Sequence, residues 1–217
     1  MRRTPFVAIG VTAVVLALAV VVRLQLDGTD APDGGDTGRL GLRGTELAEP
    51  DPRPSFTLTT TEGEPFDFEA ETRGRLTLLF FGYTSCPDIC PIHLATLAGA
   101  LDQLSSLDPV VVFVGVDWAR DTPEAVREYL DRFDPRFIGL VGTREELEAA
   151  QVAAGVPVAI VEEADASGDY LVGHAGQILA YTADDLNHVV YPFGVRRQDW
   201  VHDLPILAEI TADDGAS

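Results

Sequence analysis

The residues best suited to do chemistry are the chain's two cysteines, Cys86 and Cys90, which lie four positions apart. An apolar run ends just before them and a segment with helical periodicity follows, so we expect both thiols at a helix N-terminus. The partial positive charge there stabilises a thiolate and lowers the pKa of the thiol. A thiolate is both a nucleophile and a metal ligand. Metal capture, thiol–disulfide exchange and a purely structural disulfide therefore all stay open.

The histidines are the candidate third ligand. Two thiolates select copper(I) or zinc over hard cations, and a site that also accepts copper(II) needs a nitrogen donor. His174 lies in a loop between small residues, where its imidazole is free to reach another element. The rival is His93, three residues after Cys90, but we expect the helix to aim it away from the cysteine loop. No role is assigned to His188 and His202.

The order of apolar segments indicates an α/β domain. Continuous apolar runs at 75–83 and 110–116 predict buried strands, and each is followed by a segment with helical spacing or helix-capping residues. A cysteine pair at the start of the helix after the first of these strands predicts a thioredoxin-like fold, with a central mixed sheet flanked by helices. Further elements are predicted as strands at 56–59, 137–141, 156–161, 170–172, 177–181 and 189–191, and helices at 91–104, 123–133, 143–154 and 197–210.

The N-terminal part of the chain predicts export. Residues 1–26 contain an apolar run from Phe6 to Val22 behind two arginines, which favours a single-pass membrane anchor over a cleaved signal peptide. Positive-inside reasoning places the remaining chain on the extracytoplasmic side of the cell membrane. Residues 27–54 are rich in Gly, Asp, Pro and Glu and predict a flexible acidic tether. The domain is expected at 55–211, with a frayed tail at 212–217.

The charge of the chain limits its partners. The formal net charge is −20 and the sequence contains no lysine. Such an acidic surface would repel phosphates, so we exclude nucleic acid as a partner. No apolar stripe is left over for an obvious interface, and a monomer is the expected state.

Several short motifs occur in a fixed order with characteristic gaps. They are Phe81-Gly82-Tyr83-Thr84-Ser85-Cys86-Pro87-Asp88-Ile89-Cys90-Pro91, Val116-Asp117, Arg120-Asp121-Thr122-Pro123, Phe133-Asp134-Pro135-Arg136-Phe137-Ile138-Gly139-Leu140, Gly142-Thr143, Asp169-Tyr170-Leu171-Val172, His174 and Tyr191-Pro192-Phe193-Gly194. Together they resemble the Sco/SenC family of copper-binding assembly factors for cytochrome c oxidase. The resemblance covers roughly residues 56–210.

This resemblance implies a membrane-tethered, thioredoxin-like copper protein. It would bind copper(I), copper(II) or both through Cys86, Cys90 and His174. It would deliver the metal to the dinuclear copper site of an oxidase subunit, and other periplasmic copper carriers are possible further partners. Asp117 matches an acidic position near the family's site, where it would orient the ligands or balance their charge; a strand-end cap is the competing interpretation.

One alternative function stays open beside the metallochaperone. A membrane-tethered thiol–disulfide oxidoreductase would reduce the cysteines of the oxidase copper site, and it would need both thiols but not His174. A metal-transfer protein is not a turnover enzyme, whereas a reductase is. The sequence also departs from the family pattern at Gly173, Ala175 and Trp118, where aspartate, serine and proline are usual. The missing aspartate removes a possible hydrogen-bond partner of His174.

Overall fold

The computed structural model describes residues 38–166 and 168–211. The predicted anchor, the first part of the predicted tether and the tail lie outside the described residues. Within the described ranges, no helix is both long and apolar enough to cross a membrane.

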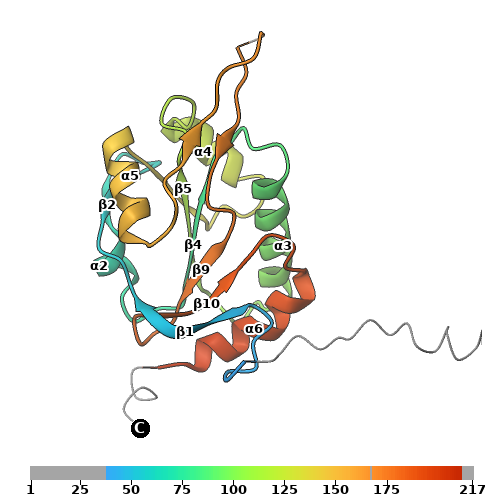
Figure 1. Ribbon diagram of the computed structural model, residues 1–217. Helices are drawn as coiled ribbons and strands as arrows, with labels where there is room; N and C mark the ends of the chain where they lie inside the picture. The colour runs from blue at the N-terminus through green and yellow to red at the C-terminus, as the bar shows by residue number, and fades with distance from the viewer. Residues whose placement is uncertain (1–37, 167, 212–217) are drawn as a thin grey trace, which may run out of the picture. The chain divides into compact units, whose positions relative to one another are not determined.

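A mixed sheet of eight strands forms the centre of the domain, in the order β1-β10-β9-β4-β5-β6-β2-β3 (Figure 1). β4 is parallel to β5 and β5 is parallel to β6, whereas every other neighbouring pair is antiparallel. This confirms the predicted α/β class with a mixed sheet. The strands are β1 (Thr45–Pro52), β2 (Thr57–Thr60), β3 (Pro65–Asp67), β4 (Thr77–Gly82), β5 (Val110–Gly115), β6 (Ile138–Val141), β9 (Ile178–Tyr181) and β10 (Leu186–Tyr191).

A second, two-stranded sheet pairs β7 (Ile160–Val161) with β8 (Val172–Gly173). These strands and the residues between them form an arm, the β7–β8 arm, that projects beyond the main sheet in Figure 1. Both strands are shorter than the sequence predicted, because only two residues on each side pair. The arm leads directly into His174 and then into β9.

Helices cover both faces of the central sheet. The helices are α2 (Phe68–Thr72), α3 (Ile89–Gln103), α4 (Pro123–Leu130), α5 (Arg144–Ala153) and α6 (Arg197–Glu209). Successive side chains of a strand point to opposite faces. Phe80 accordingly packs on His93 of α3, whereas Phe81 packs on Phe56, which stacks on Phe68 of α2. This explains why every residue of β4 is buried and why its sequence is continuously apolar.

Local capping residues start most of the helices. At α5 the Thr143 side chain accepts from the backbone N–H of Glu146, whose carboxylate accepts in return from the Thr143 backbone N–H, which makes a capping box. At α4 the capping residue is Thr122, whose side chain accepts from the backbone N–H of Ala125. Asp121 is thereby free for the contacts described below.

The predicted tether is wrong for its second half, because residues 38–54 belong to the folded domain. β1 pairs antiparallel with β10 at one edge of the sheet, and Leu42 is buried. An edge strand is held by backbone hydrogen bonds and needs few apolar side chains. The Glu-, Asp- and Pro-rich composition of β1 therefore gave no sign of a strand.

Arg53, the residue after β1, connects residues 38–54 to the remainder of the domain through its side chain. Its side chain is 1% exposed and pairs with Asp185 at 2.8 Å. It also donates to Thr72 Oγ1 at 2.8 Å and to the carbonyls of Arg75 and Thr182 at 3.0 and 2.9 Å. One guanidinium thus joins β1, α2 and the β9–β10 turn.

We expect Arg53→Met to lower the free energy of unfolding by about 3 kcal/mol. The carboxylate of Asp185 and the other acceptors around the buried guanidinium would lose their hydrogen-bond donor. Denaturant unfolding of the purified protein measures this loss. Arg73→Met is the matched control: Arg73 is exposed and pairs only with Glu69, so its loss should stay within about 0.5 kcal/mol. Equal losses for the two variants would contradict the role given to Arg53.

Candidate metal centre

The metal-ligand candidates gather at one end of the central sheet, where β4 ends and β9 begins. The cysteine loop follows β4, and His174 lies between β8 and β9. Because β9 runs antiparallel to β4, the end of β4 and the start of β9 lie side by side. Strand direction thus brings Cys86, Cys90 and His174 together, although His174 lies 84 residues after Cys90.

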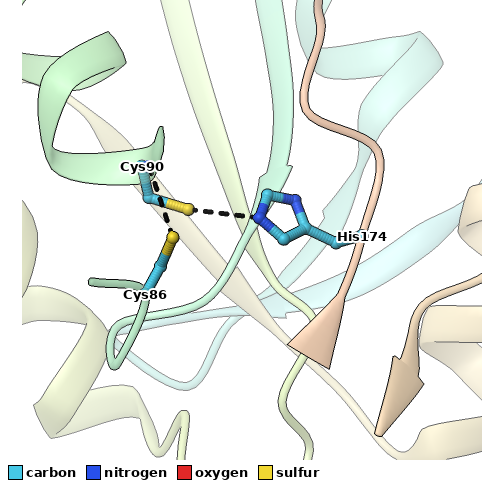
Figure 2. Close-up of side chains that lie close together, drawn as sticks. All are labelled: Cys86, Cys90 and His174. Atoms are coloured by element: carbon cyan, nitrogen blue, oxygen red, sulfur yellow. Dashed lines mark hydrogen bonds between the residues drawn. The ribbon is translucent and has the colours of Figure 1, made fainter. Parts of the chain in front are cut away.

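Figure 2 shows the two sulfur atoms and the imidazole facing one another. Each of the three side chains offers one donor atom, and these atoms all lie within 4.8 Å of one another. Cys90 Sγ lies 3.6 Å from His174 Nε2. The backbone N–H of Cys90 donates to Cys86 Sγ at 3.5 Å, and both cysteines are free thiols.

Backbone carbonyls orient the imidazole of His174. Its Nδ1 lies 2.8 Å from the carbonyl of Phe81 and 3.0 Å from that of Ala175. Carbonyls only accept, so Nδ1 carries a proton and Nε2 faces the sulfurs; when Nε2 itself is deprotonated, its lone pair points at the place where a metal would bind. The partner that Gly173 cannot supply is therefore provided by the end of β4.

The two thiols have opposite electrostatics. Hydrogen bonding from the Cys90 thiol is the main cause that lowers the pKa of Cys86 to about 3, and it outweighs burial; His174 and the Cys90 backbone N–H add to the effect. The same hydrogen bond and burial raise the pKa of Cys90 far above its usual value. Burial acts to lower the pKa of His174, but its contacts with Cys86 and the carbonyls raise it. The reduced site thus holds one thiolate and one thiol.

Gly82 makes room for the inner sulfur. A Cβ at this position would lie 2.8 Å from Cys90 Sγ and 2.7 Å from the Phe113 ring. Cys90 is completely buried, so neither neighbour has space to move away. The glycine at the end of β4 is therefore required for the sulfur to lie against the sheet.

The rival ligand His93 lies outside this cluster. It is buried in α3, and its Nε2 lies 3.0 Å from the carbonyl of Gly176. Burial lowers the pKa of His93, which keeps the ring neutral. It supports the loop after His174 instead of facing the sulfurs. Of the histidines given no role, His188 is buried in β10 beside Asp184, and His202 contacts Asp203 in α6.

Asp117 does not contact the three ligands directly. Its buried carboxylate accepts from Tyr170 Oη at 2.9 Å and pairs with Arg120. The Arg120 guanidinium lies 3.6 Å from the centre of the Tyr170 ring and donates to the Tyr170 carbonyl. These contacts fix Tyr170, which precedes His174 by four residues on the β7–β8 arm. A role for Asp117 at the site stays a prediction, and these contacts would make it indirect.

Asp121 contacts the cysteine loop, which sequence reasoning missed. One carboxylate oxygen accepts from Thr84 N at 3.0 Å and from Thr84 Oγ1 at 2.7 Å, and the other accepts from Asp117 N at 3.1 Å. Burial raises the pKa of Asp121 despite these hydrogen bonds. In the sequence Asp121 lies just before a predicted helix, and only its contacts in space show that it holds the cysteine loop in place.

Two thiols at a helix start and an oriented imidazole in a thioredoxin-like domain define a soft-metal or thiol-redox protein. The SCO1/SenC family model matches residues 45–206, and the chain belongs to that family.

Relatives show how far the likeness extends. "Protein SCO1 homolog 1, mitochondrial" of Arabidopsis thaliana is 41% identical over 123 residues, which are 55% of this chain and 36% of the relative. "Protein SCO1 homolog, mitochondrial" of Homo sapiens is 36% identical over 138 residues, 58% of this chain and 46% of the relative. The chain thus spans less than half the length of these curated relatives.

Two solved structures with copper bound resemble the domain. Arabidopsis thaliana ScoI has a TM-score of 0.64 and 33% identity, and the match covers 71% of this chain and 96% of that one. Yeast Sco1 has a TM-score of 0.67 and 27% identity, with coverage of 79% and 94%. Both confirm the fold over most of the described residues.

We expect the reduced, metal-free protein to retain one equivalent of thiolate at about pH 5, far below the ordinary thiol pKa of about 8.5. The reason is the lowered pKa of Cys86. Thiolate ultraviolet absorbance measured against pH tests this. Cys86→Ser should remove the acidic titration, whereas Cys90→Ser should keep it, since serine still donates to the sulfur. A single step near pH 8.5 in the unmodified protein would show that the thiols are equivalent.

Asp121→Ala should lower the free energy of unfolding by about 2 kcal/mol, because the buried N–H groups of Thr84 and Asp117 lose their acceptor. Asp121→Asn should lose less, since it keeps an oxygen for Thr84 and removes a charge that burial disfavours. Denaturant unfolding of the reduced protein compares the two. If alanine and asparagine cost nothing, Asp121 does not brace the loop.

Proposed function

We propose that this protein is a copper metallochaperone that delivers copper to the dinuclear copper site of cytochrome c oxidase during assembly. The observation that carries the proposal is the cluster of Cys86, Cys90 and His174, whose donor atoms lie within 4.8 Å of one another. Two sulfurs and an imidazole suit copper(I), and the imidazole lets the site accept copper(II) as well. The copper-bound Arabidopsis and yeast relatives support the choice of metal.

The electrostatics of the reduced site suit both uptake and release. The lowered pKa of Cys86 keeps this thiol deprotonated and able to bind a metal, whereas Cys90, whose pKa is raised, must lose its proton when the metal binds. Affinity should therefore rise with pH, because metal and proton compete for the inner sulfur. Release follows by ligand exchange: a partner thiolate bonds to the metal as one sulfur of this site lets go and takes up a proton.

The predicted N-terminal anchor would hold the domain on the extracytoplasmic face of the membrane, near an oxidase subunit. Other periplasmic copper carriers would be further partners, and the chain would act as a monomer.

A thiol–disulfide oxidoreductase is the second candidate, and the unequal thiols favour it. The Cys86 thiolate would attack a partner disulfide, and Cys90 would then displace the partner's second thiol and close the Cys86–Cys90 disulfide. Two electrons pass to the partner, which leaves as a dithiol. His174 takes no part in the bond changes of this reaction.

His174→Ala separates the two functions. We expect the variant to lose the sulfur-to-copper(II) charge-transfer bands and more than about 100-fold of its copper(II) affinity. A residue that only orients a metal ligand contributes up to about 100-fold, and a direct ligand should contribute more. It should keep copper(I) on the thiolates. Copper titration of the reduced protein, followed by absorbance, measures both. His202→Ala is the matched control and should behave like the unmodified protein.

The opposite result would exclude the metallochaperone. If the unmodified protein takes up no copper but reduces a disulfide peptide in a single turnover, and His174→Ala does so equally well, the reductase is the function. Cysteine variants alone cannot decide, since both functions need both sulfurs.

A further inference from the structure

A cavity of about 660 Å³ opens between α5 and the β7–β8 arm, and neither proposed chemistry uses it. One wall is a face of α5 and another is β7 with the residues before it. The third is formed by residues 116–119 and Tyr170. One of these walls leads to the site, because Ile160 of β7 pairs with Gly173 of β8, the residue directly before His174.

The cavity is lined by apolar side chains that water reaches. Trp118 is 52% exposed, Ile160 is 70% exposed and Val161 is 44% exposed. Leu147 and Val116 form the buried part of its lining. Apolar side chains exposed together, rather than singly, mark a surface that another molecule covers.

β7 also offers a free strand edge at this cavity. Within the described part of the chain, β7 pairs with β8 alone. Its second edge therefore presents backbone groups that an added strand can pair with. An extended peptide bound there would turn alternate side chains toward the cavity.

The chain segments that form two walls of the cavity are rich in acidic residues, whereas the charged side chains of the lining itself are Arg144 and Glu148. Residues 144–170 contain one basic residue, Arg144, against seven carboxylates: Glu145, Glu146, Glu148, Glu162, Glu163, Asp165 and Asp169. Arg144 pairs with Glu148 at 2.7 Å, so its charge is compensated locally. Glu162 and Glu163 follow β7 directly and are exposed. A partner that covers the apolar lining therefore lies close to Glu162 and Glu163. Their negative charge favours basic residues in the partner.

We propose that the cavity and the free edge of β7 form a docking site for an extended segment of a partner protein in which apolar side chains alternate with basic ones. The apolar side chains cover Trp118, Ile160 and Val161, and the basic ones face Glu162 and Glu163. Because the arm continues into His174, a partner held here lies next to the metal ligands. That this partner exchanges copper rests on the proposed function, whereas the binding itself does not.

Trp118 provides a direct measurement of binding. The chain has two tryptophans, and Trp200 is completely buried. A change in tryptophan fluorescence on peptide addition therefore reports on Trp118. The probe is the peptide acetyl-Arg-Val-Arg-Phe-Arg-Val-Arg-amide, added to the full-length protein without metal. We expect a saturable blue shift, and about tenfold weaker binding for Ile160→Ser, which removes one apolar contact.

Val152→Ser is the matched control, because Val152 is 67% exposed on α5 but does not line the cavity. It should bind the peptide like the unmodified protein. Equal weakening by Ile160→Ser and Val152→Ser overturns the proposal. So does equal binding of a peptide with serine in place of valine and phenylalanine, since net charge alone would then explain the attraction.

Copper titration shows whether the docking site and the metallochaperone function stand or fail independently of each other. If Ile160→Ser loses peptide binding but takes up copper normally, the docking site stands as a separate surface. If the unmodified protein binds the peptide but no copper, the docking site stands and the metallochaperone fails.

Discussion

The hydrogen bond from His174 Nδ1 to the carbonyl of Phe81 is the contact on which the candidate site depends. It joins the end of β4, which leads into the cysteine loop, to the residue that follows the β7–β8 arm. It orients the ring so that Nε2 faces the sulfurs, and it keeps a proton on Nδ1. A carbonyl at a strand end cannot turn away as a side chain can. The imidazole is therefore held in place before any metal arrives.

The same arrangement makes the two cysteines unequal. Cys86 lies at the helix start, where the Cys90 thiol and backbone N–H both donate to its sulfur, whereas Cys90 is completely buried against Gly82. A thiolate beside a proton-bearing thiol is a good metal ligand and also a good attacking group with a resolving partner. Both proposed functions therefore draw on one electrostatic property, and the imidazole is what distinguishes them.

Much of the fold could be predicted from the sequence, because buried parallel strands and helix caps are local patterns. β4, β5 and the capping box of α5 are examples. The β1 strand could not be predicted, since backbone pairing at a sheet edge leaves almost no trace in side-chain composition. At the site, the cysteine pair was evident from its spacing, whereas His174 needed a family resemblance as support. The contributions of Asp121 and of the Phe81 carbonyl are contacts across space that no spacing rule reports.

The structure shows what the glycine at position 173, where the family usually has aspartate, means for the site. A Cβ there would meet nothing closer than the carbonyl of Ile160 at 3.8 Å, so packing does not require glycine. Gly173 is instead part of β8, where it pairs with Ile160, and His174 follows it directly. The Phe81 carbonyl holds the imidazole from one side, while Asp117 and Arg120 hold Tyr170 from the other. His174 and the arm are thus each held by contacts of their own, so a side chain at position 173 is not needed to orient the imidazole. Because Ile160 of the cavity wall pairs with Gly173, the proposed docking site and the metal ligand His174 are joined by one short ladder.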